Sequence, residues 1–122
     1  MLLYIYTMTE DAAFDYLYTR AANEGITVTE LLDMTPDSVS DCNVESATFW
    51  QQVDYSHINP VSTHPDQAHD PLNAFPEERS ANRSRGAQVV TQEEIDASEI
   101  YTEELAEEID LDCDLDLCSV LI

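Results

Sequence analysis

Carboxylates are the chemically active side chains that this sequence repeats at regular spacing. Eight of them lie between Glu93 and Glu108, and Asp112, Asp114 and Asp116 follow at every second position. A fixed row of carboxylates can bind cations, or it can replace the phosphates of a nucleic acid on the basic surface of a protein. The three aspartates do not predict a calcium site, because an EF-hand loop also needs a glycine and a later glutamate.

The histidines, cysteines and glycines of the chain form no known metal-binding or catalytic motif. His57, His64 and His69 are seven and five positions apart in a proline-rich segment, which matches no zinc motif. The three cysteines are also at no zinc-like spacing, so we expect free, unreactive thiols. With two glycines the chain cannot form a glycine-rich phosphate loop, and it contains neither a nucleophile elbow nor a zinc-protease helix. We therefore predict that the protein is not an enzyme and binds no metal and no cofactor.

The overall charge decides which partners the surface attracts. Lysine is absent from the 122 residues, and four arginines oppose 26 acids, so the formal net charge at pH 7 is −22. A charge of this size attracts basic partners and repels nucleic acid and anionic membranes. Residues 93–122 contain twelve of the acids and no cation. The like-charged pairs Glu103–Glu107 and Glu104–Glu108 replace the Glu–Lys pairs that stabilise helices, so the acidity there has a cause other than helix stability.

A helix is the element that must position this row of acids. Thr91 and Glu94 form a capping box, after which Ile95, Leu105 and Ile109 fall on one side of a helix at about 100° per residue. The eight acids would lie along about 23 Å of this helix, or roughly one charge per 3 Å, which is close to the phosphate spacing along one strand of a duplex.

A change to a period of two, from Leu111 to Leu117, predicts that a strand follows the helix. Aspartate is a poor strand former, so a second strand must hold this one, and residues 1–7 are the expected partner because they are rich in aromatic and β-branched side chains. The predicted partner-binding residues are Glu93, Asp96, Glu99, Glu103, Glu104, Glu107, Asp112, Asp114 and Asp116. Tyr101 or Trp50 would supply an aromatic anchor at the interface.

Capping residues and glycine predict the helices of the first half. Thr9 and Gly25 bound a predicted helix over residues 10–24. A second capping box begins at Thr27, and the short helix that it starts must end before Pro36.

The centre of the chain gives weaker signals. Residues 44–55 fit a helical face better than a strand. Residues 57–89 contain four prolines and predict a long irregular loop. We expect Leu72 and Phe75 to pin the middle of this loop to the core.

These elements together predict a small α+β protein with a single domain over residues 1–122. Its order is an N-terminal strand and helices (residues 1–56), a long irregular proline-rich loop (57–89), and an acidic amphipathic helix with a terminal strand that pairs with the first (90–122). The longest apolar stretch is far shorter than a membrane span and lacks the positively charged leading region of a secretory signal.

In charge and size the chain resembles the acidic inhibitors that phages and plasmids use against restriction or CRISPR machinery. The resemblance implies a nucleic-acid-mimicking inhibitor in the cytoplasm of a prokaryotic host. Such a protein would bind the basic groove of a DNA- or RNA-handling protein, without direct contact to nucleic acid or membrane. No motif places the chain in a named family, so no functional residue is transferred from one.

Other interpretations of the same residues stay open. The acids could neutralise one basic partner, as in an antitoxin or an assembly subunit, or adapt an ordinary domain to multimolar salt, where the Debye length is about 3 Å or less. The spacing of Gly25 and Leu31 resembles that of helix-turn-helix proteins, but the second helix has no cation to displace counterions from DNA. The three arginines in residues 79–85 could dock on the acidic face or join two copies as a homodimer.

Overall fold

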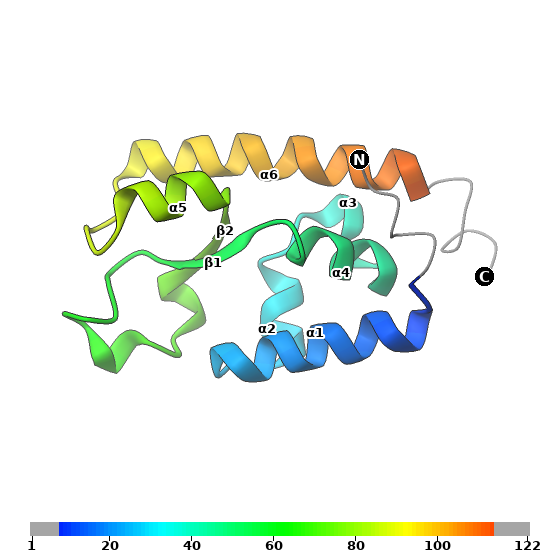
Figure 1. Cartoon of the computed structure of the whole chain (residues 1–122), viewed down its shortest axis with the longest axis horizontal. Coiled ribbons are helices and arrows are strands. Elements are labelled where there is room, and N and C mark those ends of the chain that lie inside the picture. Colours follow the sequence, from blue (N-terminus) through cyan, green and yellow to red (C-terminus); the bar gives the residue numbers. More distant parts are fainter. Residues whose placement is uncertain (1–7, 114–122) are drawn as a thin grey trace.

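Helices dominate the part of the chain that the computed structural model describes, which is residues 8–113, with side-chain surroundings through Asp110. The helices are α1 (Glu10–Glu24), α2 (Val28–Asp33), α3 (Asp37–Ser40), α4 (Asn43–Trp50), α5 (Arg79–Arg85) and α6 (Gln92–Cys113). The strands are β1 (Asp54–His57) and β2 (Ala74–Glu77), and two 3-10 turns, η2 (Pro65–Gln67) and η3 (Pro71–Asn73), lie between them. Figure 1 shows α6 along one edge of the molecule and α1 along the opposite edge, with α4 between them.

The capping signals in the sequence set the ends of the helices as predicted. Thr9 accepts a hydrogen bond from the Ala12 amide at 3.0 Å, and Gly25 ends α1 with a φ of 76°, which glycine adopts without steric strain. A full capping box begins α2. At the start of α6, the Thr91 amide donates to the Glu94 carboxylate at 2.8 Å and the Glu94 amide donates to the Thr91 hydroxyl at 3.2 Å. The predictions of these three helix starts are confirmed.

The hydrophobic core forms around α4, whose residues 44–50 are all buried. α1 packs on one side of α4 with Leu17, and α6 packs on the other side with Ile109, and both side chains are fully buried. Trp50 is also fully buried, and its indole N–H donates to the Thr35 hydroxyl at 2.9 Å. The polar edge of the indole is therefore satisfied inside the core. The predicted helix over residues 44–55 is confirmed through Trp50, whereas Asp54 and Tyr55 belong to β1.

The sheet lies where the sequence predicts no strand: β1 begins in the segment expected to be helical, and β2 lies in the segment expected to be a loop. β1 and β2 pair antiparallel, with Asp54 opposite Glu77 and His57 opposite Ala74. The two turns fill their connection, and α5 follows β2 closely. The α+β class is right, but the prediction of a long irregular loop over residues 57–89 is wrong. Each strand has four residues, and their pairing is a tertiary contact that leaves no local periodicity in the sequence.

The end of α6 corrects the prediction of a C-terminal strand. α6 continues through Cys113, so a strand cannot begin at Leu111, and Asp112 belongs to the helix. A helix that has already formed gains one hydrogen bond with each residue it adds, whereas a strand rich in aspartate needs a partner. Only the start of the predicted strand is wrong. Its remainder from residue 114, with Asp114 and Asp116, and the N-terminal strand over residues 1–7, which is its expected partner, lie outside the described residues.

Candidate functional site

The acidic row lies on the solvent side of α6. Six of the predicted partner-binding residues have described side chains, and all of them are exposed: Glu93, Asp96, Glu99, Glu103, Glu104 and Glu107. We call these six residues the acidic stripe. The opposite side of the helix is buried through Ser98, Thr102, Ala106 and Ile109. The stripe extends over about 21 Å of helix axis, at about 1.5 Å per residue.

The buried side of α6 includes two hydroxyl residues that a search for apolar periodicity misses. Ser98 donates to the Ile95 carbonyl at 2.7 Å, and Thr102 donates to the Ser98 carbonyl at 2.8 Å. These bonds satisfy both hydroxyls within the helix, so α6 can bury them without a partner from the core. Ile100, in contrast, lies on the outer side among the acids and is 62% exposed.

None of the four arginines pairs with the acidic stripe in the described part of the chain. Three of them form ion pairs elsewhere: Arg20 with Glu24 at 3.5 Å, Arg79 with Asp54 at 3.3 Å, and Arg85 with Glu77 at 2.7 Å. Arg83 is exposed and forms no ion pair with any residue of the described part. All four arginines of the chain lie in that part. Within residues 8–110, the stripe therefore stays without an arginine partner.

Arg85 and Glu77 form a buried pair that ties α5 to the sheet. Their side chains are 4% and 2% exposed, and two parallel hydrogen bonds of 2.7 and 2.8 Å join the guanidinium to the carboxylate. Ser56 donates a third bond to the same carboxylate at 2.8 Å. The hydrogen bond to Glu77 raises the pKa of Arg85 above its usual value. Arg85 also lies 3.7 Å from Glu94, whose pKa is lowered by the Thr91 amide and then by this guanidinium.

Arg20 stabilises the end of α4. Its guanidinium donates to the carbonyls of Trp50 at 2.7 Å and Val53 at 3.3 Å, and lies 5.5 Å from the centre of the Trp50 ring. The last carbonyls of a helix lack partners within the helix and carry partial negative charge, so a cation satisfies them. Contact with the indole face adds a cation–π attraction. Arg20 is therefore a structural cation.

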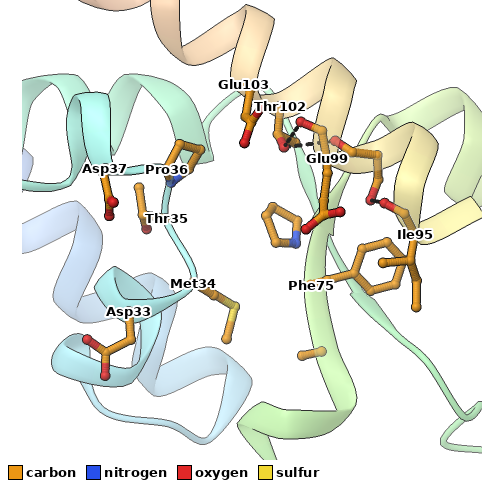
Figure 2. Close-up of a pocket in the computed structure, with 13 residues that line it drawn as sticks. Asp33, Met34, Thr35, Pro36, Asp37, Phe75, Ile95, Glu99, Thr102 and Glu103 are labelled. Carbon is orange, nitrogen blue, oxygen red and sulfur yellow. Dashed lines mark hydrogen bonds between the residues drawn. The ribbon is translucent and has the colours of Figure 1, made fainter. Parts of the chain in front are cut away.

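A groove runs beside the acidic stripe, between α6, β2 and the segment that joins α2 to α3. Its volume is about 360 Å³. Figure 2 shows Glu99 and Glu103 reaching over it from α6, Met34 pointing in from the other wall, and the ring of Phe75 on β2. Asp37 and Glu103 also line a second hollow of about 240 Å³, so the groove continues between α3 and α6.

The lining of the groove combines apolar and acidic side chains. The larger apolar residues that line it are Met34, Pro36, Phe75, Pro76 and Ile95. Its carboxylates are Asp33, Asp37, Glu99 and Glu103. Glu99 and Glu103 belong to the acidic stripe, whereas Asp33 comes from α2 and Asp37 from α3. No pattern in the sequence connects these two aspartates with the stripe. Chemically, the groove can hold an apolar group that ends in a positive charge.

The aromatic residues expected to anchor a partner are covered to different degrees. Trp50 is fully buried, so the prediction that it could be an interface anchor is wrong. Tyr101 is half-buried beside Glu78, between α5 and α6, and burial raises its pKa. Leu72 is 87% exposed and does not pin its segment to the core. Phe75 lines the groove instead.

The histidines take part in local hydrogen bonds. These join His57 to the Ala68 carbonyl at 3.1 Å, His64 to the Thr63 hydroxyl at 2.8 Å, and His69 to the Glu24 carbonyl at 3.1 Å. Across the described residues, no group of three or more His, Cys, Asp and Glu side chains is arranged to hold a metal ion. Cys42 is disulfide-bonded, which corrects the expectation that all three cysteines are free thiols.

Comparison with known proteins gives no identification. No protein-family model, no curated protein and no solved structure matches this chain. None of the helices in the described part has the length and apolar character needed to cross a bilayer. The function must therefore be argued from the geometry of the acidic stripe and the groove.

Proposed function

We propose that this protein is an acidic inhibitor that occupies the nucleic-acid-binding groove of a basic DNA- or RNA-handling protein. Its setting would be the cytoplasm of a prokaryotic host, where a phage or plasmid counters restriction or CRISPR machinery. The proposal rests on one observation: the six exposed carboxylates of the acidic stripe have no arginine partner in the described part of the chain. The protein would act by binding alone, without catalysis and without contact to nucleic acid.

The spacing of the stripe supports this proposal. Six charges over about 21 Å give about one charge per 4 Å of helix axis, and one strand of a duplex presents a phosphate every 3.4 Å or so. Because α6 is folded and packed on α4, binding would not require its backbone to be ordered. That ordering would cost roughly 1–2 kcal/mol for each residue fixed.

The placement of the arginines supports the proposal for a second reason. An exposed arginine next to the stripe would form ion pairs worth up to about 1 kcal/mol each and would compete with the cations of a partner. Arg20 and Arg85 instead bond to backbone carbonyls and a buried carboxylate. The negative potential of the stripe is therefore kept for a partner outside the chain.

A capture experiment with two matched variants tests the proposal. The stripe variant combines Glu99→Gln, Glu103→Gln, Glu104→Gln and Glu107→Gln. The control variant also removes four exposed carboxylates, three of them on α1 at the opposite edge of the molecule, through Glu10→Gln, Asp11→Asn, Asp15→Asn and Asp66→Asn. Both variants change the net charge from −22 to −18, so they separate the position of the charge from its amount.

Each tagged protein is incubated at low salt with a prokaryotic lysate, and the captured proteins are identified by mass spectrometry. We expect the wild type and the control variant to capture DNA- or RNA-binding proteins that a short DNA duplex then releases. The stripe variant should capture at least about tenfold less of them, a loss of about 1.4 kcal/mol. Equal capture of the same partners by both variants would show that the stripe is not the binding surface.

The same experiment separates the other interpretations. A captured partner that a DNA duplex cannot release would favour an antitoxin-like or assembly function, because its binding surface would not be a nucleic-acid groove. An ordinary halophilic domain would capture no specific partner and would unfold when salt is withdrawn, since its acids repel one another without screening. Circular dichroism at low and multimolar salt measures that unfolding.

A further inference from the structure

We propose that the groove beside the acidic stripe receives an arginine side chain of the basic partner. The inference rests on the proposed function only for the source of this arginine. The choice of an arginine side chain as the ligand follows from the groove itself, which places an apolar surface next to carboxylates.

An arginine side chain has an apolar stem and a planar cation, and the groove offers a surface for each. Met34 and Phe75 can cover the stem and the flat face of the guanidinium. Glu99 and Glu103 lie one helical turn apart and reach over the groove (Figure 2). A carboxylate accepts two parallel hydrogen bonds from a guanidinium, a geometry that the ammonium group of lysine cannot reproduce. The groove therefore favours arginine over lysine.

No arginine or lysine of this chain supplies the cation. The four carboxylates of the groove form no ion pair with any residue between positions 8 and 110. The chain has no lysine, and its four arginines are placed elsewhere. Three buried hydroxyl residues line the wall, and each already donates to a backbone carbonyl: Thr35 to Leu31, Ser98 to Ile95 and Thr102 to Ser98. An uncharged polar ligand would thus find no free buried partner there, whereas a cation would relieve the repulsion among four acids.

A titration with small probes tests this inference without the partner protein. The full chain is labelled with ¹³C at its methionine methyl groups, of which Met34 lies in the groove. Argininamide, lysinamide and citrullinamide are added in turn, the last because its side chain is uncharged and has nearly the same shape as that of arginine. We expect argininamide to shift the Met34 methyl signal in a saturable way. Lysinamide should bind at least threefold more weakly, and citrullinamide should cause no saturable shift.

Variants then locate the binding. Glu99→Gln with Glu103→Gln should weaken argininamide binding about tenfold or more, because both carboxylates line the groove. The matched control is Glu93→Gln with Glu104→Gln, which removes two exposed acids of the same helix that do not line it. This control should change the affinity less than about twofold at physiological salt, where the Debye length is about 8 Å.

A charge-neutral variant tests the apolar surface of the groove. Phe75→Leu keeps every carboxylate and should weaken argininamide binding while leaving the fluorescence of buried Trp50 unchanged, which reports an intact core. Equal losses in the Glu99/Glu103 and Glu93/Glu104 variants, or no saturable shift at Met34, would overturn the inference in favour of diffuse attraction. Those results would not change the outcome of the lysate capture, so the proposed function would still be tested separately. Conversely, argininamide could bind in the groove while a DNA duplex fails to release the captured partners. That outcome would support the arginine site and contradict the proposal of nucleic-acid mimicry.

Discussion

Replacing Arg85 with methionine should remove a large part of the stability of this protein. Arg85 and Glu77 are almost fully buried and share two hydrogen bonds of 2.7 and 2.8 Å. After the substitution, Ser56 would be the one side-chain donor left to the buried Glu77 carboxylate among the described residues. Removing one partner of a buried ion pair costs about 3–5 kcal/mol. A domain of this size is stable by roughly 5–15 kcal/mol in total, so the loss would be about a fifth or more.

Urea denaturation followed by fluorescence measures this loss, because the single tryptophan, Trp50, is fully buried. With a denaturant slope of about 2 kcal/mol per molar urea, the midpoint should fall by about 1.5–2.5 M. Arg83→Met is the matched control, since it lies on the same helix, changes the same charge and has an exposed side chain. That control should alter the stability by no more than about 0.5 kcal/mol.

A double variant completes the test of the buried pair. Glu77→Leu combined with Arg85→Met should be more stable than Arg85→Met alone, because an apolar pair leaves no uncompensated buried charge. The reasoning would be refuted by either of two results. One is a loss in Arg85→Met no larger than in Arg83→Met, and the other is a double variant that recovers nothing.

Three further predictions concern the core and the turn after α1. Thr35→Val should lower the free energy of unfolding by about 1–3 kcal/mol in urea denaturation, because the buried Trp50 N–H loses its acceptor. Gly25→Ala should cost at least about 1 kcal/mol in thermal unfolding, since φ is 76° and the added β-carbon meets the His69 ring, and an unchanged midpoint would contradict this. Burial and nearby carboxylates raise the pKa of Tyr55 to about 12. The fold therefore favours the neutral phenol, and stability should fall as pH rises from about 10 towards 12. Tyr55→Phe, which removes a buried hydroxyl without a partner in the described part, should reduce that fall and be at least as stable as the wild type at pH 7.

Local sequence signals determined the starts of α1, α2 and α6 and the exposed side of α6, but they missed α3 and α5, which have no side-chain cap. Thr9, Thr27 and Thr91 mark helix starts because their hydroxyls bond to amides three residues later. The alternation of acids with Ile109 and Leu105 placed the acidic stripe in water, because a helix repeats every 3.6 residues. The same reasoning failed at Leu111, where a period of two among aspartates predicted a strand and the helix continued.

Tertiary structure alone decided where the sheet lies, how the arginines are used and that the groove exists. Phe75 and Met34 line the same groove with Glu99, although the chain separates them by more than twenty residues at each step. Arg85 became a buried structural residue because the β1–β2 pairing placed Glu77 within its reach. Capping and periodicity act over about four residues, so they determine helices from sequence. Contacts between distant segments depend on how the core packs around α4, which no local pattern records.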